Sequence, residues 1–209
     1  TSRDNVKTLK DIEGKELAGA RSTTNYQMAE FFLKKQGVDL GKLKVVNTAP
    51  PGLVSYAVAD RADAVQIWEP AYTLMLAKKP SIRTLDLGIA KTWKDFGGNT
   101  LPYLGVGAHA DWADANPGAV QKLYTTYKDA VEWVQKNPEE AAPMLAKGAP
   151  PEELKAVAAM IKSNERLAMK LTKAADVRKD IEAVYKAGME INYLPSMPSA
   201  ASVYDKPLK

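Results

Sequence analysis

The feature that most constrains this chain is a regular alternation of short apolar runs and amphipathic segments over residues 8–79. Strands are expected at residues 16–20, 43–46 and 64–67. Each is followed by a segment with helical spacing, the first closed by Gly37 and the others covering 53–59 and 71–78. Strands that alternate with helices are joined by right-handed crossovers. The pattern therefore predicts an α/β fold with a parallel sheet and flanking helices.

The pattern changes after Pro80. Residues 82–87 and 101–107 predict two more strands, separated by a polar loop. The rest predicts helices, which start where proline suits a first turn, at Asn116-Pro117, Asn137-Pro138 and Pro151-Glu152. Gly188 is predicted to close the last helix, and the tail 195–209 is predicted to be irregular. The first of these helices carries an apolar stripe of Val120, Leu123, Tyr124, Tyr127, Val131 and Val134.

The residue counts exclude several classes of function. The chain has no Cys and one His, His109, so we expect neither a metal site nor a cofactor. Its 29 basic residues exceed the 25 acidic ones by 4. Most are scattered lysines rather than an arginine-rich face with interleaved aromatics, so we expect no nucleic-acid partner. No apolar run reaches the roughly 18 residues that a membrane-spanning helix needs.

Polar and aromatic side chains follow the predicted strands at their carboxyl ends, where open parallel sheets bind ligands. They are Arg21, Ser22, Thr23 and Thr24 after the first strand, Thr48 after the second, and Trp68 and Glu69 after the third. Hydroxyls beside the free N–H groups of a helix start favour a carboxylate, sulfonate or phosphate. Two other interpretations stay open: Ser22 or Thr23 caps its helix, and Trp68 and Glu69 are packing and surface residues.

Several motifs also follow one another in a characteristic order. They are Leu9-Lys10-Asp11-Ile12-Glu13-Gly14-Lys15, Ser22-Thr23-Thr24, Ala62-Asp63-Ala64, Trp68-Glu69-Pro70, Asp111-Trp112-Ala113-Asp114-Ala115-Asn116-Pro117 and Tyr193-Leu194-Pro195. In this order the sequence resembles the periplasmic solute-binding proteins of the nitrate/sulfonate/taurine and thiamine-precursor type. The resemblance covers nearly the whole chain and raises the anion-site interpretation of Ser22-Thr23-Thr24 above simple capping, although one residue can do both.

The resemblance implies the periplasmic-binding-protein type II fold, with two α/β lobes that close on a small molecule by a hinge motion. The units that open the first lobe in that family have no counterpart here. Residues 6–100 are therefore expected to be a complete second lobe, and 101–209 the return strand and C-terminal helices of a truncated first lobe. Because Thr1 is not a native start, we expect a processed or trimmed chain. Oligomerisation, strand exchange or a cleaved N-terminal piece would cover the exposed apolar face.

The resemblance also implies roles for the residues at the strand ends. Ser22, Thr23 and Thr24 would donate hydrogen bonds to an anionic group. Trp68 would wall the site, and Glu69 would face an amine or hydroxyl. Thr48 and Tyr103 are further expected ligand contacts. Arg21 stands where the family commonly has Gly, and it either pairs with the anion or points to solvent.

The function implied is that of a periplasmic, non-catalytic component of an ABC importer, which delivers a small organic anion to a membrane permease. Two alternatives remain. The first is an enzyme on the same fold, a desulfinase or a pyrimidine synthase, whose chemistry depends on Cys or His side chains that this chain almost lacks. The second is the effector domain of a LysR-type regulator, against which the Trp-Glu-Pro and Asp-Trp-Ala motifs weigh. The ligand can be a sulfonate, a carboxylate or a similar anion.

Overall fold

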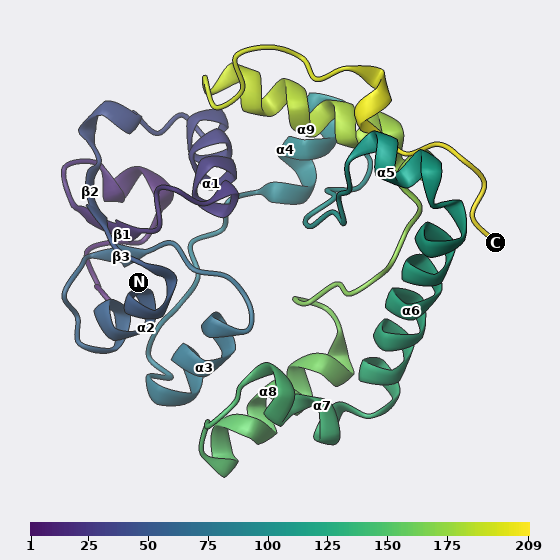
Figure 1. Cartoon of the computed structure of the whole chain (residues 1–209). Coiled ribbons are helices and arrows are strands. Elements are labelled where there is room, and N and C mark those ends of the chain that lie inside the picture. The colour runs from purple at the N-terminus through teal and green to yellow at the C-terminus, as the bar shows by residue number, and fades with distance from the viewer.

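The computed structural model describes residues 1–209, and its sheet has three parallel strands in the order β2-β1-β3 (Figure 1). They are β1 (Glu16–Gly19), β2 (Lys44–Asn47) and β3 (Ala64–Val65). In the central strand, Leu17 lies opposite Val45 on one side and Ala64 on the other. The predicted parallel sheet is confirmed, although the third strand ends at Val65 instead of residue 67.

Helices make up most of the remaining chain. They are α1 (Thr24–Lys35), α2 (Pro50–Val58), α3 (Ala71–Lys78), α4 (Ile89–Phe96), α5 (Ala110–Ala115), α6 (Pro117–Lys136), α7 (Pro138–Leu145), α8 (Pro151–Ser163) and α9 (Arg178–Glu190). Short 3-10 helices cover Leu9–Ile12, Leu40–Lys42, Ala174–Val177 and Ala200–Ser202. Proline begins α6, α7 and α8 as predicted. The sequence did not predict α4 or α5.

Three predictions of local structure are wrong. Residues 82–87 and 101–107 are not strands. A strand needs a neighbour to complete its hydrogen-bond ladder, and the backbone of residues 82–87 pairs with another segment at one point alone, where Arg83 and Thr1 exchange two hydrogen bonds of 2.9 Å. The backbone of residues 101–108 makes no backbone hydrogen bond, and Leu104 is 86% exposed. Gly188 does not end the last helix, which runs on to Glu190 with Gly188 buried beneath Leu194.

Helices α5 to α9 make up the C-terminal half, which forms an arc in Figure 1. This arc meets the N-terminal half, with its sheet and helices α1 to α4, at two places. At one, helices α1, α4 and α9 share a core of Phe31, Phe32, Trp93, Ala183 and Ala187. At the other, Leu74 of α3 packs against the core of α7 and α8. Helix α6 spans the far side of the arc and buries none of its residues. The division at residue 100 and the cover over α6 remain predictions.

The central strand depends on a close contact between its last residue and α1. The Tyr26 side chain is 1% exposed and turns one edge of its ring towards Gly19, where an added Cβ would come within 2.5 Å of the ring atoms Cδ2 and Cε2. Burial raises the pKa of the Tyr26 hydroxyl, with a further contribution from Glu30. The absence of a side chain at Gly19 thus lets α1 pack directly onto β1.

Replacing Gly19 with alanine is expected to lower the free energy of unfolding by about 1–3 kcal/mol, because the ring or the strand must move. Urea unfolding at neutral pH measures the effect. Gly118→Ala is the matched control: it lies in α6 with open space around its Cβ position, so its stability should stay equal or rise by up to about 1 kcal/mol. Equal stability of Gly19→Ala and the natural chain would contradict the packing argument.

A cluster of charged side chains around Glu13 explains the motif of residues 9–15. The Glu13 carboxylate accepts a hydrogen bond of 2.8 Å from the Asp39 backbone N–H and lies 2.6 Å from Lys10 Nζ and 3.6 Å from Lys42 Nζ. The Asp39 N–H, followed by Lys10, lowers the pKa of Glu13 from 4.5 to about 2. Glu13 thereby ties the segment before β1 to the turn before β2, which is a structural role.

The lowered pKa predicts a pH dependence of stability. A carboxylate with a depressed folded-state pKa stabilises the fold above its unfolded pKa, and this contribution is lost as the pH falls from 4.5 towards 2. Glu13→Gln should therefore be less stable at pH 7 and lose less stability over that window. Urea unfolding between pH 2 and 7 tests this. Glu132→Gln, on the exposed face of α6, should show no comparable change, and identical pH profiles for Glu13→Gln and the natural chain would refute the role.

Candidate functional site

The strand order indicates a candidate ligand site beside the central strand. Because β2 and β3 lie on opposite sides of β1, the direction of the chain reverses there. Ligands of open α/β sheets bind outside the carboxyl ends of the strands at such a switch point. The residues that follow β1 and β3 therefore border the candidate site more directly than those that follow β2.

Thr23 acts as the cap of α1. Its hydroxyl accepts a hydrogen bond of 3.2 Å from the Tyr26 backbone N–H and donates one of 2.7 Å to the Ala20 carbonyl. These bonds occupy the hydroxyl and hold the turn between β1 and α1 in place. The capping interpretation thus describes Thr23 in this structure.

Ser22, Thr24 and Arg21 remain available to a ligand. All three are exposed, and neither the Ser22 nor the Thr24 hydroxyl bonds to the rest of the protein. The Arg21 backbone is held at both ends, because its N–H donates to Asn47 Oδ1 at 3.0 Å and its carbonyl accepts from Gln27 Nε2 at 2.8 Å. Its guanidinium forms no ion pair. The turn therefore presents fixed backbone, free hydroxyls and one free positive charge.

Of the two further predicted contacts, the structure places Thr48 next to this turn and Tyr103 apart from it. Thr48 follows β2 and lies beside the end of β1, because its N–H donates to the Gly19 carbonyl at 3.1 Å. Its hydroxyl lies so close to Gly52 that a side chain at position 52 would not fit. Tyr103 is 58% exposed and belongs to the segment between α4 and α5, which stands away from the sheet (Figure 1). Thr48 thus borders the end of β1, whereas Tyr103 does not join the group at the switch point.

Trp68 lies on the β3 side of the candidate site. It is partly buried against the cluster of Ala18, Ala20, Leu53 and Ala62, which includes the end of β1. The indole thus packs as a wall that links the two strand ends. Its partial exposure leaves surface for a ligand.

Glu69 is already engaged within the protein. Its side chain is 10% exposed; Oε2 accepts a hydrogen bond of 3.0 Å from the Thr73 N–H, and Oε1 lies 2.7 Å from Arg166 Nε. The structure thus shows the carboxylate capping the start of α3 and pairing with an arginine from the other half of the chain. The predicted partner, an amine or hydroxyl of a ligand, would have to compete with these bonds.

Gln66 is a candidate that the sequence analysis missed. It directly follows β3, and its N–H donates to the Ala18 carbonyl at 2.9 Å. Its side-chain oxygen is buried without a hydrogen-bond partner, which is rare and unfavourable in native proteins. The sequence offered one sign of this residue's role, a polar amide within the otherwise apolar run Ala64-Val65-Gln66-Ile67.

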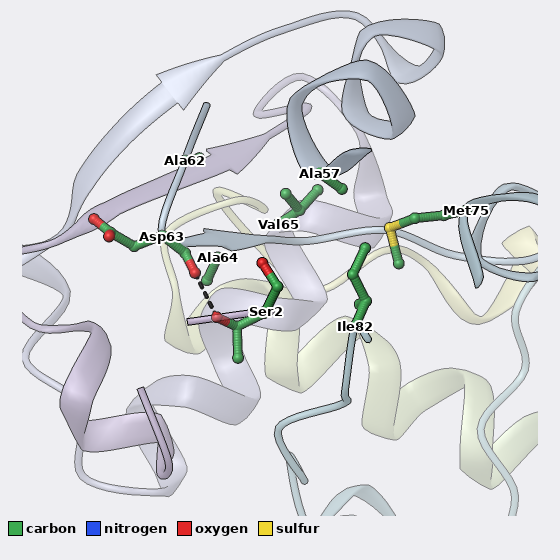
Figure 2. A pocket seen from close by; sticks show the side chains of 9 residues that line it. Ser2, Ala57, Ala62, Asp63, Ala64, Val65, Met75 and Ile82 are labelled. Carbon is green, nitrogen blue, oxygen red and sulfur yellow. Dashed lines mark hydrogen bonds between the residues drawn. The ribbon is translucent and has the colours of Figure 1, made fainter. Parts of the chain in front are cut away.

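A separate pocket lies at the opposite end of β3. It has a volume of about 20 Å³, room for little more than one water molecule. Figure 2 shows it between Asp63 and Ala64 on one side and Met75 and Ile82 on the other. The Thr1 hydroxyl borders it and donates to the Asp63 carbonyl at 2.6 Å. Its position at the amino end of the strand excludes it from the switch-point site.

The structure contains no group of three or more side chains that could hold a metal ion. None of its helices combines the length and the apolar character required to cross a bilayer. His109 precedes α5 as its N-cap residue, and α5 stands apart from the sheet in Figure 1. The chemistry at the switch point therefore comes from hydroxyls, an amide, an indole and one guanidinium.

One family model and several known proteins match this chain. A family model described as NMT1/THI5 like matches residues 1–141. A provisionally named binding protein of Brucella abortus is 23% identical over 146 residues, which are 70% of this chain and 44% of that protein. A Brucella suis protein with a similar provisional name matches equally well. The chain thus spans less than half the length of these relatives.

Solved structures show the same fold. The alkanesulfonate-binding protein SsuA of Xanthomonas axonopodis pv. citri, bound to MOPS, has a TM-score of 0.64 and 20% identity, covering 97% of this chain and 65% of that one. The periplasmic aliphatic sulphonate binding protein SsuA of Escherichia coli has a TM-score of 0.68 and 18% identity, covering 93% and 63%. The predicted periplasmic-binding-protein fold is confirmed, over about two thirds of each solved chain.

The hydrogen bonds of the β1–α1 turn predict a contrast between neighbouring variants. Thr23→Ala removes the cap of α1 and should lower the free energy of unfolding by about 1 kcal/mol. Ser22→Ala removes a hydroxyl with no partner in the protein, so stability should stay within about 0.5 kcal/mol. Urea unfolding of both variants measures the contrast. A larger loss for Ser22→Ala would mean that the serine, not the threonine, stabilises the turn.

Proposed function

This chain belongs to the NMT1/THI5-like family, and on that basis we propose that it is the substrate-binding component of an ABC importer for a small organic anion. The observation that carries the proposal is the turn between β1 and α1. There the Arg21 guanidinium and the Ser22 and Thr24 hydroxyls stand unpaired beside the first N–H groups of a helix. Such N–H groups and the helix dipole favour an anion.

A sulfonate is the anion class that we propose. Two structural relatives are described as sulfonate-binding proteins, and a tetrahedral anion with three oxygens suits several converging donors. The Arg21 side chain would add a charged donor, Ser22 and Thr24 would add hydroxyls, and Thr23 would hold the turn. Thr48, whose N–H donates to the Gly19 carbonyl at the end of β1, would border the site, and Tyr103 stays a predicted ligand contact.

Gln66 and Trp68 would complete the site from the β3 side. A ligand group that hydrogen-bonds the Gln66 amide would relieve the cost of its unpaired burial, which is about 1–3 kcal/mol for a typical buried polar group. The Trp68 indole would cover the organic part of the ligand. We propose that the site binds without catalysis, since it offers no Cys or His as a nucleophile or base.

The remaining parts of the proposal follow from the family. The protein would work in the periplasm and deliver its ligand to a membrane permease. Residues 6–100 would act as one lobe, and residues 101–209 would belong to the other. The uncovered face of α6 would be covered by a second copy of the chain or by a further segment.

Isothermal titration with ethanesulfonate tests the proposal. The natural chain should bind it, and Ser22→Ala should weaken binding about tenfold, the effect of losing one hydrogen bond to a charged group. Gln66→Leu should weaken binding and yet raise the free energy of unfolding by about 1–2 kcal/mol, because an unpaired buried amide is removed. These opposite signs distinguish a binding residue from a structural one.

Lys128→Ala, an exposed change in α6, is the control and should leave both quantities unchanged. The proposal is wrong if the natural chain binds no small anion. The proposed position of the site is wrong if ethanesulfonate binds equally well to the natural chain, Ser22→Ala and Gln66→Leu.

A further inference from the structure

Glu69 is the only acidic residue among those that directly follow the three strands, residues 20–24, 47–52 and 66–70. It comes immediately after Trp68, and its side chain is only 10% exposed. A carboxylate so placed is weakly screened by water. Left alone, its negative charge would oppose the binding of an anion at the same edge of the sheet.

The Glu69 carboxylate forms an ion pair with Arg166, a residue of the C-terminal half. It lies in the segment after α8, and that segment turns back towards α3 (Figure 1). Its Nε lies 2.7 Å from Glu69 Oε1, and its Nη2 donates to Thr73 Oγ1 at 2.9 Å. The guanidinium also stacks over the Tyr72 ring, 5.2 Å from the centroid. Three contacts thus fix its position at the start of α3.

The local geometry favours the pair over a free Glu69. The second carboxylate oxygen of Glu69 accepts a hydrogen bond from the Thr73 N–H. Thr73 is 4% exposed, and its hydroxyl accepts the hydrogen bond from Arg166. Neither oxygen of Glu69 is therefore free of a protein partner. A ligand amine would have to displace a guanidinium held by two further contacts.

We propose that Arg166 is a positioning residue of the anion site, which cancels the charge of Glu69 and so preserves a preference for anions over ammonium-bearing ligands. Glu69 then supports the turn that carries Trp68 and does not bind the ligand itself. This inference rests on the proposed function and adds to it the charge preference of the site. It also links that preference to a residue in the C-terminal half.

The test compares two sulfonates that differ in one charged group, ethanesulfonate and taurine, by isothermal titration. An uncompensated charge within about 10 Å at an effective dielectric constant of about 20 changes the affinity for a monovalent anion roughly tenfold. Arg166→Gln should thus weaken ethanesulfonate binding about tenfold. Taurine should lose much less, because its ammonium group is attracted to the freed carboxylate. The affinity ratio of the two ligands is the decisive quantity.

Three further variants separate charge from structure. Glu69→Gln combined with Arg166→Gln should return the ratio to that of the natural chain, and Arg166→Lys should keep it. Lys78→Gln is the matched control, since Lys78 anchors the other end of α3 through an ion pair with the buried Glu153. It should lower the melting temperature without changing the ratio.

An equal loss of both ligands in Arg166→Gln, not reversed in the double variant, would overturn the inference and leave Arg166 with a structural role. That result would leave the proposed function standing, since the natural chain would still bind ethanesulfonate. Failure of the natural chain to bind either sulfonate would overturn both. A ratio that shifts in Arg166→Gln and recovers in the double variant supports the inference.

Discussion

The parallel pairing of β1 with a strand on each side is the constraint on which the rest of the structure depends. Because β2 and β3 flank β1, the turn after β1 and the segment after β3 emerge side by side at one edge of the sheet. Gly19, the last residue of β1, also lets Tyr26 and α1 lie directly on the strand. The start of α1, which carries the proposed anion-binding residues, thus takes its position from β1.

Helix α3 joins the candidate site to the C-terminal half. Its first turn is bound by Glu69 and Arg166, its middle packs through Leu74 on the core of α7 and α8, and its last turn carries Lys78, which pairs with Glu153. The turn that bears Trp68 leads directly into this helix. A displacement of the C-terminal half would therefore reach the wall of the site through α3. This coupling runs through packed side chains and ion pairs, the usual carriers of such effects.

The segments that lack partners show how far local pattern predicts structure. Helix α6 begins at its expected proline and carries its expected stripe, yet buries no residue. Residues 101–107 have the apolar character of a strand but form neither a strand nor a ladder. Proline and helical periodicity act within a few residues of one another, so α6 was predictable. A strand needs a second segment, so residues 101–107 were not.

The sequence by itself determined the parallel α/β core, because the alternation of strands and helices is local, and it determined which turns carry Ser22, Thr23 and Trp68. The tertiary structure decided what each of these residues does. It assigned Thr23 to the cap, left Ser22 free, buried the Gln66 amide without a partner and engaged Glu69 with Arg166. Glu69 and Arg166 are far apart in the chain, and no spacing rule connects them. Only the packing of α8 against α3 brings that pair together.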